Sequence, residues 1–193
     1  MSTYHKMWVM EMSVRVSTWA NRFIVAAIVK GALAVILTAY FVLGQFAWLK
    51  PEVSRVIAGG SAGTWLTVGY VTCLLVGVIG VAVTALFYRH IDVTLGKPCA
   101  GSLNLLAWIH LILMNVGVIG ATWLMMIGGY LGGAAMLPPA VGGKGWTAQE
   151  VHEKVSYSIP GGYPLWIAVF TILLRIGVLA GGLGYVLAWR RKT

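Results

Sequence analysis

Long apolar stretches separated by short polar ones dominate the pattern of this 193-residue chain. Four stretches are predominantly apolar, and they cover residues 23–49, 64–88, 103–131 and 163–189. A helix needs about 20 apolar residues to cross the ~30 Å hydrocarbon core of a bilayer. The pattern therefore predicts an all-α fold, an integral membrane four-helix bundle.

Breaker residues mark the two short connections between these spans. Gly59-Gly60-Ser61 predicts a turn within the first outer loop, 50–63. Gly96-Lys97-Pro98 ends a helix within the inner loop, 89–102, so that the second and third spans become antiparallel neighbours.

The second outer loop, about 132–162, is the only sizeable extramembrane segment. Thr147 and Glu150 have the spacing of a capping box, which predicts a short helix over about 148–156. Glu150 and Lys154 are four residues apart in the order that favours an ion pair on a helix. We interpret the segment as a helix that lies over the outer membrane surface.

The N-terminal segment differs from the spans. Residues 1–22 alternate polar and apolar positions, so we expect them to lie along the inner interface, with residues 23–193 forming the bundle. The first span is too long for the core of a signal peptide, and we expect it to be retained. Because the first span is apolar without interruption only from Gly31 onward, we expect Lys30 at or just below the inner headgroups. Its alkyl stem can extend there so that the ammonium group reaches the headgroups.

Composition and charge agree with a membrane location. The chain is 59% hydrophobic and only 10% charged, whereas a soluble domain carries about 25% charged residues. Nine Lys and Arg flank one side of the spans and four flank the other, which predicts a multi-pass protein of the cell membrane with both termini cytoplasmic. These cations lie at span ends, so we expect them to meet anionic lipids and no nucleic acid. The nine are Lys6, Arg15, Arg22, Lys30, Arg89, Lys97, Arg190, Arg191 and Lys192, and the four are Lys50, Arg55, Lys144 and Lys154.

Groups for autonomous chemistry are scarce. Cys73 falls within the second span and Cys99 in the inner loop, which predicts two free thiols. All five acidic residues lie outside the spans, so there is no intramembrane carboxylate for a proton relay. We expect no catalytic residues and no metal site in this chain.

Arg175 lies near the middle of the fourth span. An arginine there costs at least ~2.5 to 3.5 kcal/mol without compensation. A carboxylate of another subunit, a haem propionate, an anionic lipid headgroup, or backbone carbonyls with water can each offset that cost. Small residues at helical spacing from Arg175, among them Ala168 and Gly182, predict that its face turns inward or toward a partner chain.

Glycines recur four residues apart in the third and fourth spans. The pairs are Gly128 with Gly132, Gly129 with Gly133, and Gly177 with Gly181. Such registers let helix backbones approach closely, within this chain or against a partner, and less often they line a ligand cavity.

His110 and Met114 are the candidate cofactor ligands. They are four residues apart on one face of the third span, where they can ligate haem iron or copper. The alternative is a hydrogen-bonded histidine in a packed core, and no second histidine lies at the same depth. The His5, Met7, Met10 and Met12 group, and His152 with Glu150 and Glu153, are weaker metal candidates.

Several motifs from Lys30 onward resemble the first four helices of subunit I of B-type haem-copper oxidases. These are 39–46 in the first span, 66–70 opening the second, Arg89-His-Ile-Asp with Gly96-Lys97-Pro98, and 106–117 leading to 128–130. In that family a low-spin haem histidine precedes a glycine of the second helix, but Val68 precedes Gly69 here. The resemblance implies a relative of the respiratory chain without the haem ligands.

These observations predict an accessory subunit of a respiratory or other membrane oxidoreductase complex. The first candidate for that complex is a terminal oxidase. The chain would lack a cofactor of its own, and haem, copper or quinone would belong to other integral membrane subunits. The alternatives are a haem- or quinone-binding electron-transfer protein that uses His110, and a small transporter.

Overall fold

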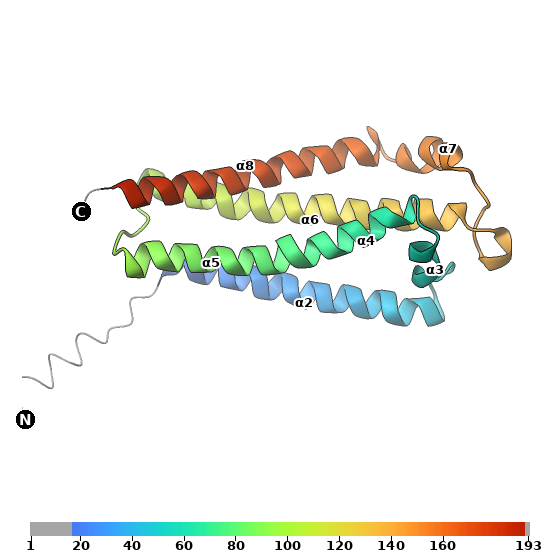
Figure 1. The fold of residues 1–193 in the computed structure, drawn as a ribbon, viewed down its shortest axis with the longest axis horizontal. Coiled ribbons are helices and arrows are strands. Elements are labelled where there is room, and N and C mark those ends of the chain that lie inside the picture. The colour runs from blue at the N-terminus through green and yellow to red at the C-terminus, as the bar shows by residue number, and fades with distance from the viewer. Residues whose placement is uncertain (1–16, 192–193) are drawn as a thin grey trace, which may run out of the picture.

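The computed structural model describes residues 17–191, and every regular element within that range is helical. Four helical units are long and apolar enough to cross a membrane: α2 (Thr18–Ala47), the unit Gly63–Thr94, α6 (Ser102–Met136) and α8 (Gly162–Arg190). Figure 1 shows them side by side, with α2 beginning and α8 ending at the same end of the molecule. The all-helical class is thus confirmed, and a long apolar helix lies at each of the four predicted spans, with ends that differ by up to six residues.

The second unit changes its helical winding along its length. It consists of α4 (Gly63–Thr72), the π-helical η1 (Cys73–Gly80), α5 (Val81–Arg89) and the π-helical η2 (His90–Thr94). π-Helical turns are rare in proteins, and those that occur are often found at functional sites. η1 packs against α2 at mid-length.

A capped start explains where α2 begins. The Ser17 hydroxyl accepts a hydrogen bond from the backbone N–H of Ala20 at 3.1 Å and donates one to the Asp92 carboxylate. α2 therefore includes the residues from Thr18 to Arg22 that we predicted to lie along the interface. The remainder of that predicted segment, residues 1–16, lies outside the described residues.

The end of the molecule that carries the two outer loops, the loop end, holds one predicted helix and two short helices that were not predicted. Thr147 and Glu150 form both hydrogen bonds of a capping box, and α7 (Ala148–Val151) continues into η4 (His152–Ser156), as expected. The short η3 (Pro139–Val141) precedes them. The first outer loop, predicted as a turn, contains α3 (Val53–Ala58), whose N-cap is Glu52.

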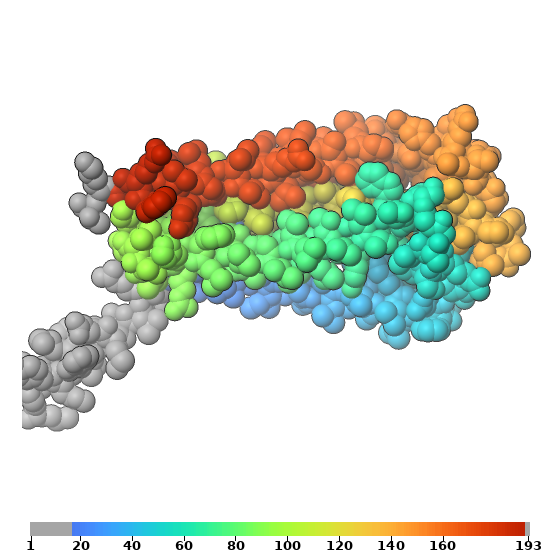
Figure 2. Space-filling model, viewed as in Figure 1, coloured from blue at the N-terminus to red at the C-terminus, as the bar shows by residue number. Residues whose placement is uncertain are grey.

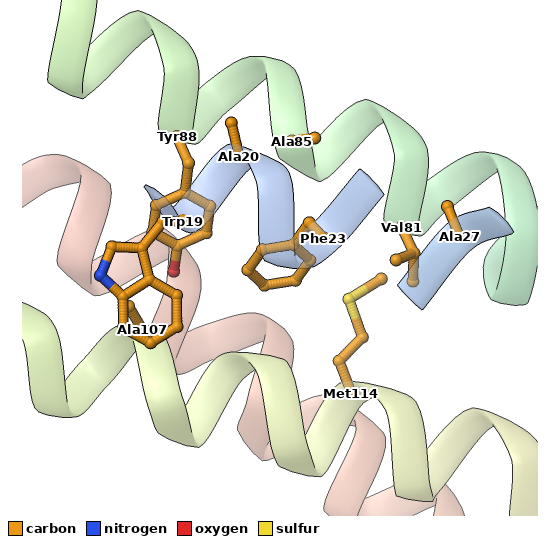
Figure 3. Close-up of a cluster of buried hydrophobic side chains, with 9 residues drawn as sticks. All are labelled: Trp19, Ala20, Phe23, Ala27, Val81, Ala85, Tyr88, Ala107 and Met114. Carbon is orange, nitrogen blue, oxygen red and sulfur yellow. The ribbon is translucent and has the colours of Figure 1, made fainter. Parts of the chain in front are cut away.

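The core lies between α2, α5 and α6 near the end that carries both described termini. Figure 3 shows Phe23 of α2 facing Tyr88 of α5, while Met114 reaches from α6 toward Val81. A second cluster joins α3, α4 and α6 near the loop end. α2 packs mainly on η1 and α5, whereas α8 packs almost entirely on α6.

Glycines bring α6 into close contact with its neighbours. A side chain at Gly129 would overlap the backbone of Leu66 in α4, and one at Gly133 would lie 2.9 Å from the backbone nitrogen of Gly63. A side chain at Gly177 of α8 would lie 3.0 Å from a backbone carbon of Leu113. The predicted small-residue registers are therefore used for packing within the chain.

Candidate functional site

Arg175 lies at the middle of α8 and points away from the rest of the chain. It lies thirteen positions after Gly162 and fifteen before Arg190, which at 1.5 Å per residue is about 20 and about 22 Å. Its side chain is exposed. Within residues 17–191 the Arg175 side chain forms no hydrogen bond and no ion pair, so this part of the chain provides no group that compensates its charge.

The acidic residues that the structure describes are already engaged at the two ends of the molecule. Glu52 pairs with Lys50 at 2.9 Å and with Arg55 at 2.8 Å. Asp92 accepts hydrogen bonds from Ser17 and from the backbone N–H of Cys99. In the second outer loop, Glu150 pairs with Lys154, and Glu153 accepts a hydrogen bond from Gln149. None of these four carboxylates is placed to meet a cation at mid-helix.

The surface around Arg175 is small and apolar. Ala168 and Gly182 are exposed on its face, a side chain at Gly182 would meet nothing within 4 Å, and Leu179 is 71% exposed. Only 11% of the most apolar window of α8 is buried in the chain, against 33% for α6. The face was predicted to turn inward or toward a partner, and the structure turns it outward. Figure 2 shows α8 along one edge of the molecule.

Lys30 is a second cation near the middle of its helix, and its burial contradicts the snorkelling that was predicted for it. It lies twelve positions after Thr18, which places it about 18 Å along α2. The side chain is 5% exposed, and its ammonium group has no hydrogen-bond partner in the described chain. Lys30 does not snorkel, because it lies on the buried face of α2 with Phe23, Ala27 and Ala34.

His110 occupies a helix contact. It is 7% exposed, its Nδ1 lies 3.2 Å from the Tyr88 hydroxyl, and its ring lies 5.0 Å from that of Phe23. A side chain at Gly181 of α8 would strike the imidazole, so α8 closes over it. These are the contacts of a packed, hydrogen-bonded histidine, and a haem ligand at His110 stays a prediction.

Met114 lies one turn beyond His110, and it is 4% exposed. Its methyl group approaches Gly80 of η1, and its backbone nitrogen faces Gly177 of α8. The thioether therefore fills the space between three helices, as methionine commonly does. The structure brings His110 and Met114 together in one core but keeps both apart from Arg175, which faces outward.

Three further polar residues of the long helices form only local hydrogen bonds. The Asn115 amide nitrogen donates to the Leu111 carbonyl at 2.6 Å, and the Thr122 hydroxyl donates to the Val118 carbonyl at 2.7 Å. Gln45 contributes its backbone carbonyl to Lys50. These bonds do not join the three residues into one polar network. The carbonyl oxygen of the Asn115 side chain is buried and has no hydrogen-bond partner among residues 17–191.

No group of three or more His, Cys, Asp or Glu within residues 17–191 is arranged to hold a metal ion. His152 packs edge-on against Tyr157, with ring centroids 5.3 Å apart. His5, Met7, Met10 and Met12 lie outside the described residues.

Both cysteines are free thiols, as predicted. Burial raises the pKa of Cys99 to about 11, and the nearby charge of Asp92 adds to the shift. At the loop end, the hydrogen bond from Lys50 lowers the pKa of Glu52 to about 2. The electrostatics outside the spans thus give a protonated thiol at one end of the molecule and an ionised carboxylate at the other.

Comparisons of the chain with protein-family models, with curated proteins and with solved structures give no match. The resemblance to subunit I of haem-copper oxidases therefore rests on the quoted residues alone.

Proposed function

We propose that the chain is an accessory integral membrane subunit of a multi-subunit respiratory or other membrane oxidoreductase complex, a terminal oxidase being the first to test. The outer face of α8 packs on helices of another subunit, and Arg175 pairs there with a carboxylate or a haem propionate. The single observation that carries the proposal is Arg175, a mid-helix cation that is exposed and has no partner within residues 17–191.

The energetic argument favours a protein partner over lipid. Snorkelling relieves cations near helix ends, but Arg175 lies about 20 Å from either end of α8. The cost of at least ~2.5 kcal/mol then remains unless an anion meets it at that depth. Ala168 and Gly182 leave room for a partner helix to approach the backbone of α8.

The oxidoreductase character of the complex is proposed from the resemblance. A relative of the catalytic subunit that has Val68 where the family has a haem ligand would be retained for assembly, and not for chemistry. Haem, copper and quinone would then be held by the partner subunits. Anionic lipids would surround the cations at the helix ends.

We further propose that the four long helices form one bundle in the cell membrane with both termini cytoplasmic. With Lys30 buried at mid-depth, eight Lys and Arg remain on the side of the termini against four on the other. The difference still favours a cytoplasmic position for the end where α2 begins.

The experiment compares Arg175→Leu with Arg175→Lys in the native membrane. The subunits that co-purify in mild detergent are identified by mass spectrometry, and the oxidase activity of the preparation is measured. We expect Arg175→Leu to lose the partner subunits, since it removes the paired charge, and Arg175→Lys to retain most of them. Unchanged retention and activity in Arg175→Leu would reject the pairing.

A further inference from the structure

A hollow lies where α2 begins, next to the loop that joins η2 to α6, and we call it the charged hollow. Its volume is 590 Å³, and two opposite charges line it, Arg22 of α2 and Asp92 of η2. Both side chains are half-buried, and within residues 17–191 neither takes part in an ion pair. A cation and an anion that line one hollow without pairing leave two complementary charges for a ligand to meet.

The position of Arg22 is set by two aromatic rings. Its guanidinium lies 4.4 Å from the ring centre of Trp19 and 4.6 Å from that of Trp108. Cation–π contacts of this kind engage the flat face of the cation. The N–H groups point outward in the plane of the guanidinium and can donate to the oxygens of a phosphate.

Asp92 is held by two neutral donors. One carboxylate oxygen accepts from the Ser17 hydroxyl, and the other accepts from the backbone N–H of Cys99. These bonds orient the carboxylate but do not neutralise its charge. Each oxygen of a carboxylate can accept a second hydrogen bond, so Asp92 can also accept from an ammonium group.

The charged hollow lies at the level of the phospholipid headgroups. α2 has 30 residues and is about 45 Å long, so about 7 Å at each of its ends extends beyond a hydrocarbon core of ~30 Å. Arg22 is four positions after Thr18, which is about 6 Å from the start of α2. Asp92 is two positions before Thr94, where its helical unit ends. Both charges can therefore meet the polar part of a lipid.

An apolar groove leads from the charged hollow along the seam between α2 and α6. Arg22 lines both spaces, so they adjoin. The groove has a volume of 720 Å³, and its walls include Val29 of α2 and Ile112 of α6, each about half exposed. A second groove of 410 Å³ follows between the same helices, with Leu33 and Trp123 in its lining. A long acyl chain can lie along this seam, whereas a small polar ligand would leave it empty.

We infer that the charged hollow and the groove between α2 and α6 bind one phospholipid with an ethanolamine headgroup. Its phosphate accepts from Arg22, its ammonium donates to Asp92, and an acyl chain lies in the groove. A glycerol headgroup offers Asp92 no cation, and a choline headgroup has no N–H to donate to it. The site thus differs from the other helix-end cations, for which we propose anionic lipids. The inference rests on the proposed function only in that the four helices lie in a membrane, and it requires no partner subunit.

The test is native mass spectrometry of the full chain, purified without partner subunits in mild detergent and titrated with one phospholipid at a time. The three probes have identical acyl chains and an ethanolamine, a choline or a glycerol headgroup. We expect the ethanolamine lipid to bind about 3- to 10-fold more tightly than the other two, between the values typical of exposed ion pairs and of buried hydrogen bonds to charged groups. Equal affinities, or a preference for either other lipid, would overturn the inference.

Removing one charge at a time should change the lipid preference in a way that a folding defect cannot. Asp92→Asn keeps the size of the side chain but removes the anion. It should lower the affinity for the ethanolamine lipid to that for the choline lipid and make the anionic glycerol lipid the preferred one. Arg22→Gln removes the phosphate contact and should weaken binding of all three lipids about 3- to 10-fold. An unchanged ethanolamine preference in Asp92→Asn would overturn the inference.

A matched pair of variants on α2 tests the groove. Val29→Trp fills the groove and should weaken binding of all three lipids while their order is kept. Val35, on the same helix, is 69% exposed and lines neither groove, so Val35→Trp should bind like the parent chain. The thermal midpoint of each ligand-free variant separates binding from folding. Equal affinity in Val29→Trp and Val35→Trp would overturn the placement of the acyl chain, and no outcome depends on whether Arg175 holds partner subunits.

Discussion

One added methyl group at Gly117 should loosen α8 from α6. A side chain there would place its Cβ 2.7 Å from the Leu174 Cα and 2.7 Å from the Phe170 carbonyl oxygen. Both are backbone atoms of α8, so no side-chain rotation relieves the overlap and the helix itself must shift. The Gly117→Ala variant therefore tests whether α8 is docked as described, with Arg175 turned outward.

The size of this destabilisation is best obtained by comparing the unfolding free energies of two matched variants, Gly117→Ala and Gly182→Ala. Replacing glycine by alanine within a helix gains about 1 kcal/mol of intrinsic propensity. Gly182 of α8 has open space around it, so Gly182→Ala receives that gain without an overlap. The propensity term cancels in the comparison, and Gly117→Ala should be less stable than Gly182→Ala by about 1 to 3 kcal/mol, the usual cost of overpacking.

The assay is thermal unfolding in detergent. Unfolding is monitored by the reaction of a fluorescent maleimide with Cys73, which is buried in the folded chain, and Cys99→Ser removes the second thiol from all variants. For a chain of this length, 1 kcal/mol corresponds to about 2 to 4 °C. We expect the midpoint of Gly117→Ala to lie several degrees below that of Gly182→Ala. Equal midpoints, or a higher one for Gly117→Ala, would refute the packing of α8 on α6.

Three further predictions concern the segments outside the spans. Thr147→Ala removes the cap of α7 and should cost about 0.5 to 2 kcal/mol, seen as faster amide exchange in that helix and nowhere else. The Glu52 carboxyl should titrate near pH 2, and its ion pairs should be lost only as the pH falls through that value. Lys50→Ala removes the main hydrogen bond and should raise the pKa of Glu52, while Arg55 continues to lower it; an unchanged midpoint would contradict this. Cys99 should be alkylated slowly at pH 8, and Asp92→Asn should speed the reaction by lowering the thiol pKa; a rate like that of an exposed cysteine would speak against its burial.

The regular parts of the fold could be predicted from the sequence because each has a local signal. Span lengths follow from the apolar runs, and the α7 cap follows from the spacing of Thr147 and Glu150. α3 was missed because its six residues are too few to establish a helical repeat. The early start of α2 depends on Ser17, whose hydroxyl bonds to Asp92, 75 residues away.

Arg175 and Lys30, the two cations near the middle of their helices, show where sequence reasoning stops. The position of Arg175 along its span was readable, but the direction of its side chain depends on which face of α8 the glycines of α6 accept. Lys30 was placed at the headgroups because the apolar run was counted from Gly31. The spacing of Phe23, Ala27, Lys30 and Ala34 matches one helix face, and this pattern could have indicated that Lys30 turns inward.

The central claim is that another subunit covers the α8 face around Arg175, and site-specific photocrosslinking in the native membrane tests it most directly. A photoreactive amino acid at Leu179, one turn from Arg175 and 71% exposed, is compared with one at Leu86 of α5, 64% exposed. We predict a discrete crosslink from position 179 to a membrane protein, one that Arg175→Leu abolishes, and none from position 86. Crosslinks from position 179 to lipid alone would contradict the account.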